Sequence, residues 1–402
     1  MNLFTGFRAF PILAGVGLLG LSAFGASDAA DFPARRWNPS VHRSLVRTVE
    51  RHRGDAQAYA VFDFDLTSAL CDIEHVAMDA AINNLDFAFS PEDWERTFLR
   101  DVADDGMPLA ADAPQATVRN VVLDCADLHR ELLALRRTKP MEAVRRTEAF
   151  EAFSAKVRYL REYGAYAKWG FGFSLPWIKR LFEGQTPEAF RSSLQREIAR
   201  CLREQPYERK TWRTPAGRPG RAGAVSVTVT RGLTFPDEMA DLFRVLRESG
   251  IAVYVVSGGY EEAVRAAVAA LGLGIPAERV YGFRLKSDAC GRIVGETPPG
   301  APFTWAKGKP VVIRTLIAPQ HGGAEPILVA GDSNGDHAML TAFPKMESGL
   351  IFDTHPAADS ALGQLLTNVR AGKSDGRYLI QERDETTGRF LPFGPNGVHA
   401  SP

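Results

Sequence analysis

Short apolar runs, most of which lead directly into a polar residue or a glycine, recur along this chain and predict the strands of a parallel sheet. The runs occupy 58–62, 251–256, 279–283, 327–330 and 350–352. A continuous apolar run, without strict alternation, is typical of a strand that is buried on both faces. Helical periodicity lies between the later runs, at 236–248, 260–271, 309–317 and 336–343. Strands that alternate with helices predict an α/β fold, a Rossmann-like parallel sheet with helices on both faces.

A long helical stretch interrupts this alternation directly after the first strand. Helical periodicity dominates 72–231, clearest at 116–135 and 187–202, before a Pro/Gly/Arg-rich loop at 210–221 and a short strand at 225–230. We therefore expect one α/β domain with an inserted, mainly helical cap. The expected division is a core of 27–75 and 232–371, a cap of 76–231, and a polar, weakly ordered tail of 372–402. A leading helix at 41–49 and a hairpin at 284–294 complete the predicted elements.

The N-terminal segment has the pattern of a secretory signal peptide. An apolar stretch at 9–24 follows a single charge, Arg8, and small residues continue to Ala30. We expect cleavage near Gly25 or Ala26, so that 1–26 is removed and the protein is periplasmic or secreted, with no membrane contact afterwards. An uncleaved anchor is the alternative, although the stretch is short for a spanning helix.

Composition narrows the function classes. The chain has 402 residues, 45% hydrophobic and 24% charged, which is ordinary for a globular protein. Lys plus Arg equals Asp plus Glu, at 48 each, so nothing indicates a nucleic-acid partner. The four cysteines form no CxxC pair, which removes support for a zinc site and leaves free thiols or one disulfide open. Oligomeric state cannot be predicted from these features.

The first apolar run leads into two carboxylates, Asp63 and Asp65, with Thr67 two residues further on. Sites in open α/β sheets lie beyond the carboxyl ends of the strands, so these side chains are expected to face a crevice. Two nearby carboxylates repel one another unless a cation lies between them, and Mg²⁺ favours such hard oxygen ligands. One carboxylate can attack phosphorus while the other transfers a proton. A loop that only caps a helix remains the alternative for this motif alone.

Three later segments offer matching chemistry. Ser257 and Gly258 follow the second run and suit a phosphate oxygen, or else cap a helix. Asp332 and Asp336 flank a glycine turn after the fourth run and could contact the same cation. Lys309 begins a helix, where the helix dipole does not favour a cation, so it is a candidate for an anionic site, with Lys307 as the alternative. Their common order and placement favour one shared site.

These four motifs together resemble those of the haloacid dehalogenase-like hydrolase superfamily, over roughly 58–355. DFDLT, VVSGG, Lys309 and GDSNGD match its first to fourth motifs, and the insert resembles the cap of the phosphoserine-phosphatase-like branch. A narrower resemblance, carried by LPWIKRLFEG, TWAKGK and PILVAGDSNGD, is to secreted bacterial phosphorylcholine phosphatases.

The resemblance implies a function and a set of roles. It implies a phosphoric monoester hydrolase in which Asp63 is the nucleophile and Asp65 the acid/base. Ser257 and Lys309, with Thr67 and Gly258, would contact the phosphoryl group. Mg²⁺ would be held by Asp63, the Asp65 carbonyl and Asp332, with Asp336 direct or one step removed. The second acid, Asp65, disfavours a dehalogenase, since a departing halide needs no proton.

The substrate is expected to be a small phosphomonoester, phosphorylcholine-like or phosphoserine-like. Aromatic residues crowd 163–182, and Trp169 and Trp177 are candidates for a cage around a quaternary ammonium. They could equally form the core of the cap. A phosphotransferase of the same fold and a non-catalytic protein that binds a phosphorylated ligand are the alternative functions.

Overall fold

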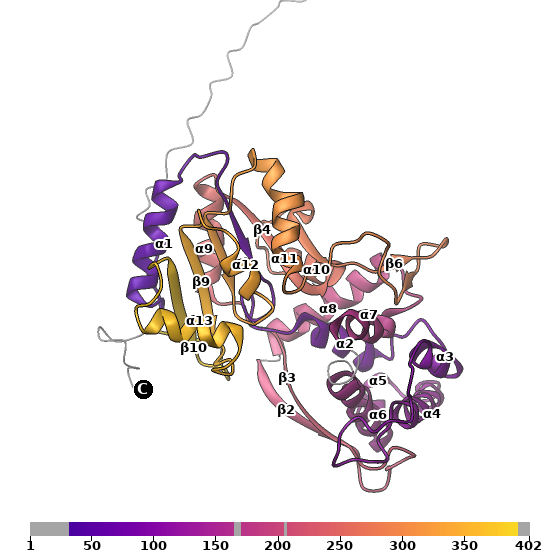
Figure 1. Ribbon diagram of the computed structural model, residues 1–402. Helices are drawn as coiled ribbons and strands as arrows, with labels where there is room; N and C mark the ends of the chain where they lie inside the picture. The colour runs from indigo at the N-terminus through magenta and orange to yellow at the C-terminus, as the bar shows by residue number, and fades with distance from the viewer. Residues whose placement is uncertain (1–31, 165–169, 205–206, 393–402) are drawn as a thin grey trace, which may run out of the picture.

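The computed structural model describes residues 32–164, 170–204 and 207–392. They form an α/β unit and a mainly helical cap beside it (Figure 1). The predicted signal peptide, 1–26, lies outside the described residues. Within them, no helix is both long enough and apolar enough to cross a bilayer.

The α/β unit is built on a mostly parallel sheet whose central strand is the first in sequence. In the described residues the sheet has seven strands in the order β11-β10-β9-β8-β1-β4-β5, and all of them except β11 run parallel. The strands are β1 (Tyr59–Phe62), β4 (Ala252–Tyr260), β5 (Val280–Phe283), β8 (Leu328–Gly331), β9 (Ser348–Asp353), β10 (Tyr378–Arg383) and β11 (Phe390–Leu391). Because β1 lies between β4 and β8, the ends of these three strands meet at one edge.

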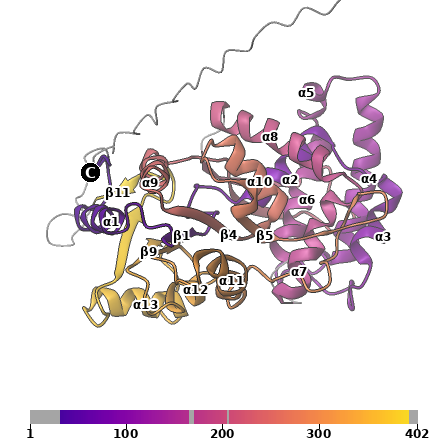
Figure 2. The same ribbon diagram turned by 90° about the horizontal axis from the view of Figure 1, so that it is seen from above.

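Helices cover both faces of the sheet, as the alternating strand and helix patterns predict (Figure 2). One face carries α1 (Pro39–Arg51), α9 (Asp237–Glu248) and α10 (Glu261–Ala270), and the other carries α11 (Gly308–Val312), α12 (His337–Thr341) and α13 (Ala361–Arg370). Successive residues of a strand point to opposite faces. Ala60 and Phe62 therefore pack in one apolar core, and Tyr59 and Val61 in the other. This explains why the run at 58–62 shows no polar alternation.

The cap is inserted between β1 and α9, as the sequence predicts. Its helices are α2 (Ile73–Asn84), α3 (Trp94–Leu99), α4 (Val118–Arg136), α5 (Met141–Val144), α6 (Glu148–Tyr159), α7 (Phe171–Ile178) and α8 (Pro187–Glu204). Two hairpins accompany them: β2 (Glu208–Arg213) with β3 (Ser226–Arg231), and β6 (Lys286–Ser287) with β7 (Ile293–Val294). The second hairpin lies within the predicted 284–294.

Two segments differ from the sequence prediction. The loop expected at 210–221 begins as strand, because β2 pairs with β3 and sets Trp212 opposite Val227. The expectation of a weakly ordered tail at 372–402 is wrong for β10 and β11. β10 extends the sheet beside β9, and β11 pairs with β10. β2 is rich in charged residues, and both β2 and β10 are stabilised by pairing with another segment of the chain. Such pairing leaves little local pattern in the sequence.

All four cysteines are free thiols. Cys71, Cys125 and Cys201 are buried, whereas Cys290 is exposed in the turn between β6 and β7. The disulfide left open by the sequence is therefore absent from the described structure.

Candidate active site

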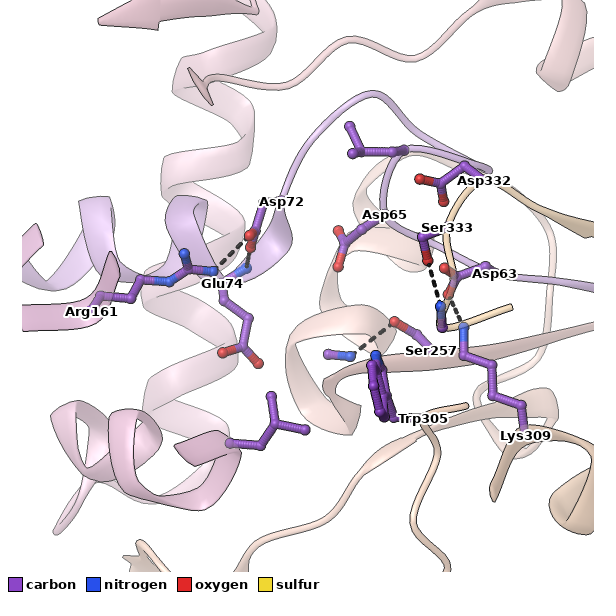
Figure 3. Close-up of a pocket in the computed structure, with 15 residues that line it drawn as sticks. Asp63, Asp65, Asp72, Glu74, Arg161, Ser257, Trp305, Lys309, Asp332 and Ser333 are labelled. Atoms are coloured by element: carbon purple, nitrogen blue, oxygen red, sulfur yellow. Dashed lines mark hydrogen bonds and ion pairs between the residues drawn. The ribbon is translucent and has the colours of Figure 1, made fainter. Parts of the chain in front are cut away.

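The polar residues of the four motifs meet at one cavity, at the carboxyl ends of the central strands. Asp63 follows β1, Ser257 lies in the last part of β4, and Asp332 follows β8 (Figure 3). The cavity has a volume of about 360 Å³. Its wall consists of Asp63, Asp65, Leu66, Asp72, Glu74, Arg161, Leu175, Ser257, Gly258, Gly259, Trp305, Lys309, Asp332, Ser333 and Gly335. Lys309 lines this cavity and is buried, whereas the alternative Lys307 is exposed.

Lys309 links the carboxylates at the floor of the cavity. Its Nζ lies 2.7 Å from Oδ1 of Asp63 and donates a 2.6 Å hydrogen bond to Oδ1 of Asp336. Burial alone would lower the pKa of Lys309, but the two carboxylates outweigh it and raise this pKa above its ordinary value. The lysine is thus a fixed positive charge beside Asp63. This placement explains a cation at the start of α11, where the helix dipole does not favour it.

The acids of this floor are more crowded than one lysine can neutralise. Asp63, Asp332 and Asp336 are buried and offer oxygens that all lie within 4.8 Å of one another. Burial and the Asp336 carboxylate raise the pKa of Asp63 to about 7, and burial, Asp336 and Asp63 raise the pKa of Asp332 well above its usual range. Such a deficit of positive charge among hard oxygen ligands fits a divalent cation such as Mg²⁺.

Asp332 and Asp336 have different surroundings. Both oxygens of Asp336 are occupied: Oδ1 by Lys309, and Oδ2 by the amides of Asp332 and Ser333 and the Ser333 hydroxyl, at 3.0–3.1 Å. Asp336 therefore organises the turn, with Asp332 left as the better ligand. Thr67 donates a 2.9 Å hydrogen bond to Oδ1 of Asp332. Its hydroxyl holds an acid of the site, which corrects the expectation that Thr67 contacts the substrate.

The surroundings of Asp65 disfavour its charged form. Its Oδ1 accepts a 2.7 Å hydrogen bond from the Ile73 amide at the start of α2. Burial, Asp72 and Asp63 raise the pKa of Asp65 well above its usual range. Asp63 faces a lysine and Asp65 does not, so the two carboxylates suit opposite roles, one as a nucleophile and one as a proton donor.

Ser257 and the glycines beside it form a second side of the floor. The Ser257 hydroxyl accepts a 3.0 Å hydrogen bond from the Gly259 amide, which leaves its own proton available to a ligand. The Trp305 ring lies against the glycines of two motifs: a Cβ on Gly258 would be 3.3 Å from it, and one on Gly335 2.9 Å. These glycines admit the indole to the cavity wall. The only indication in the sequence that Trp305 lies near the site is its position four residues before Lys309.

The mouth of the cavity contains charged residues that sequence reasoning missed. Asp72 accepts a 2.6 Å hydrogen bond from Arg161 (Figure 3). Glu74 lies 2.7 Å from Nζ of Lys179. Asp72 also caps α2 through the amides of Glu74 and His75. An acid at a helix start is common for capping alone, so the sequence offered no clear signal. Asp72, Glu74 and Arg161 line the cavity on the side away from Asp63 and Lys309 (Figure 3).

Trp177, one of the two tryptophans expected to form an aromatic cage, does not line the cavity. Trp177 is 1% exposed in the core of the cap, where its indole donates to the Phe98 carbonyl at 2.9 Å. This corrects its assignment to substrate binding, because a ring packed in the core cannot reach the cavity. Trp169 lies outside the described residues. Gly258 lines the cavity as expected.

The fold and the site define a class of protein. Residues 174–341 match the haloacid dehalogenase-like hydrolase family, a match that spans Ser257 and Lys309 as well as the acids of the fourth motif. Over these residues the chain is similar to haloacid dehalogenase-like hydrolases, in agreement with the resemblance that its motifs indicate. Asp63 precedes the matched residues, and the parallel pairing of β1 with β4 and β8 places it in the same site.

A solved structure shares this fold. A functionally unknown protein from Anaerococcus prevotii DSM 20548 is 25% identical, with a TM-score of 0.80 over 92% of this chain and 98% of that one. Two others are more distant. Cytosolic 5'-nucleotidase IIIB bound to cytidine is 15% identical, with a TM-score of 0.39 over 87% and 86% of the two chains. A phosphoserine phosphohydrolase-like protein from Francisella tularensis subsp. tularensis SCHU S4 is 10% identical, with a TM-score of 0.34 over 79% and 100%. No curated protein matches the chain.

Proposed function

We propose that this protein is an exported, Mg²⁺-dependent phosphatase that hydrolyses small phosphomonoesters through an aspartyl-phosphate on Asp63. The observation that carries the proposal is the pair Asp63 and Asp65 at one strand end, with Lys309 beside the first only. Each of these residue types can perform one step of phosphoryl transfer, and all of them line the same cavity.

The first step is attack on phosphorus. A carboxylate oxygen of Asp63 forms a bond to phosphorus while the bond from phosphorus to the ester oxygen breaks. Asp65 gives its proton to the departing ester oxygen, so that the product leaves as a neutral alcohol. Ser257 and Lys309 hold the phosphoryl oxygens during this transfer.

The second step returns the enzyme to its starting state. Asp65, now a carboxylate, takes a proton from a water molecule, and the resulting hydroxide oxygen attacks phosphorus. The bond between phosphorus and Asp63 breaks, which releases inorganic phosphate and a free Asp63 carboxylate.

A bound Mg²⁺ would supply positive charge against the crowded acids and the phosphoryl oxygens. Asp63 and Asp332 are the side chains that would hold it, joined by the Asp65 backbone carbonyl. Thr67 fixes the orientation of Asp332 for this purpose. Asp336 keeps Lys309 and the turn of the fourth motif in place.

The test is hydrolysis of p-nitrophenyl phosphate by the purified protein. We expect turnover that is abolished by EDTA, restored by added Mg²⁺, and lost in Asp63→Asn, because an amide oxygen is a poor nucleophile. Thr341→Val is a matched control, since this exposed hydroxyl bonds only to its own helix. Activity that survives EDTA or Asp63→Asn would contradict the mechanism.

The substrate is proposed to be a small amino-alcohol phosphate, phosphorylcholine-like or phosphoserine-like. The cavity volume of about 360 Å³ suits a small ligand. Its wall offers the Trp305 ring to a positively charged group, in place of the expected Trp177. A panel of phosphorylcholine, phosphoserine and glycerol phosphate would rank the substrates. Equal kcat/KM for the charged and uncharged leaving groups would count against this preference.

Two alternatives are separable by product analysis. A phosphotransferase would pass the phosphoryl group to added glycerol, whereas a hydrolase releases inorganic phosphate in proportion to the alcohol formed. A binding protein would retain the ligand with Mg²⁺ present and form no product.

Export is supported by the apolar segment at 9–24 and the small residues after it. We expect the mature protein to begin near residue 27 and to appear in the periplasmic or culture fraction. N-terminal sequencing of the isolated protein checks this, and an intact N-terminus in the membrane pellet would favour the anchor.

A further inference from the structure

The C-terminal hairpin packs against the loop that carries the two acids of the first motif. β10 joins the sheet beside β9, and β11 returns against it. The turn between them reaches the loop that follows β1: a Cβ on Gly388 would lie 2.1 Å from Cδ2 of Leu70. Gly388 also has a φ of +70°, so a side chain there is disfavoured on two grounds. The hairpin and the loop are therefore in close contact.

Arg383, the last residue of β10, extends this contact to the backbone of the loop. Its side chain is 3% exposed, and Nη1 donates a hydrogen bond to the carbonyl oxygen of Leu66. Nε donates to Glu385 at 3.2 Å, and Nη2 is buried with no hydrogen-bond partner among the described residues. Burying a guanidinium is costly unless its donors are satisfied. The hairpin would fold at lower cost with an apolar residue at this position.

The contact is made to a residue with an unfavourable backbone conformation, Leu66. It lies between Asp65 and Thr67 and has a φ of +54°, in the left-handed region. That conformation is unfavourable for an L-residue and persists where the surroundings enforce it. Relaxing it would redirect both neighbours, and Thr67 is the residue that holds Asp332. The angle at Leu66 thus sets the positions of several groups of the site.

The charge of Arg383 also acts on the site. Burial, Asp336 and Asp63 raise the pKa of Asp332, and the Arg383 guanidinium opposes them. Arg383 therefore contributes positive charge to the site in addition to that of Lys309.

We propose that Arg383 is a positioning residue: from the C-terminal hairpin it fixes the Leu66 carbonyl, and through it the turn that presents Asp65 and Thr67. This inference rests on the proposed function of the site. Because Ser257 and Lys309 belong to other segments, substrate binding is expected to survive the loss of Arg383. Proton transfer by Asp65 is expected to suffer, since a small misplacement of a catalytic group costs much of its rate.

The experiment compares Arg383→Met and Arg383→Lys with Arg389→Met, which removes an exposed arginine from the same hairpin. Steady-state hydrolysis of p-nitrophenyl phosphate is measured together with amide hydrogen exchange of the peptide covering 64–72. We expect Arg383→Met to lower kcat at least about tenfold with KM within about threefold of the wild type. The amides of Ser68 and Ala69, which donate to the Phe64 carbonyl, should exchange faster. Arg383→Lys should lie between, and Arg389→Met should match the wild type.

Two outcomes overturn the proposal. The first is an unchanged kcat in Arg383→Met, whatever happens to the exchange, and the second is a lowered kcat with exchange of 64–72 unaltered. If Arg383→Met does not fold, Gly388→Ala decides, since it keeps the arginine but forces the hairpin that carries it away from Leu70. The same faster exchange and lower kcat are then expected, and wild-type values for both overturn the proposal. A wild-type protein without phosphatase activity overturns the proposed function instead, while the exchange comparison still tests the contact between hairpin and loop.

Discussion

Two aspartates one residue apart acquire different chemistry because their neighbours differ. Asp63 faces the ammonium group of Lys309, whereas Asp65 faces the Ile73 amide and two other acids. The first is thereby suited to carry negative charge and the second to carry a proton. The sequence predicted the two roles only through resemblance. Spacing alone could not show which carboxylate meets the lysine, because Lys309 is distant in sequence.

This division leads to a prediction for Asp65→Asn with p-nitrophenyl phosphate. The nitrophenolate leaves without needing a proton, so the first step should proceed. The second step lacks its base and should slow by about 10²–10⁴-fold. We expect a burst of nitrophenolate that approaches one equivalent of enzyme, followed by slow turnover, in a stopped-flow measurement. A steady rate equal to that of the wild type, with no burst, would remove Asp65 from the mechanism.

At the scale of elements, the cap is held by an aromatic cluster around a buried histidine of α4. His129 is 1% exposed, stacks on Phe153 and accepts a 3.1 Å hydrogen bond from the Trp94 indole through Nδ1. Burial lowers the pKa of His129 from 6.5 to about 4. A proton on this ring would also compete with the bond from Trp94. The cluster is therefore stable only with a neutral histidine.

The cap is expected to lose stability in mild acid through this residue. The unfolded chain takes up the proton near pH 6.5 and the folded chain only near pH 4, so stability falls as the pH drops between these values. The loss should reach roughly 2.5 kcal/mol at pH 4.5. Urea unfolding at pH 7 and pH 4.5 measures it, with His129→Gln as a variant that keeps an acceptor and does not titrate. A pH dependence that is the same in both proteins would refute the assignment.

Helices and strands could be predicted where their own residues carry an apolar run or a helical periodicity. The apolar runs at β1, β4 and β8 and the periodicity of α4 and α8 gave each element within a few residues. β2 and β10 were missed because their strand character comes from pairing with β3 and β9. α13 was missed although Leu362, Leu365, Leu366 and Val369 follow helical spacing behind Ser360.

For the whole molecule, the site lies where the α/β unit meets the cap. The phosphate floor comes from strand ends, and its position followed from the sequence because parallel strands end at a common edge. The mouth comes from residues such as Arg161 and Leu175, whose placement depends on how the cap folds over the sheet. The sequence therefore leads to a definite hypothesis for the reaction and to a less definite one for the leaving group.

The repulsion among the buried acids should make the stability of the whole protein depend on Mg²⁺. A cation that binds only the folded chain stabilises it by about 2.7 kcal/mol at one hundred times its dissociation constant. We expect Mg²⁺ to raise the melting temperature of the wild type by a few degrees and that of Asp332→Asn by much less. In EDTA, Asp332→Asn should be at least as stable as the wild type, because one charge has left the cluster. Equal Mg²⁺ responses in the two proteins would contradict this cation site.

The sheet order has a consequence for how the chain is made. β1 leaves the ribosome before either of its neighbours, and its four residues are fully buried in the finished fold. Until β4 and β8 are synthesised, this strand is an unpaired apolar edge with no sheet to join, and contacts between distant segments form slowly. The segment that carries Asp63 is therefore exposed in the nascent chain until its partner strands are made, and we expect chaperones to protect it there. Fragments that stop short of β8 should aggregate instead of folding.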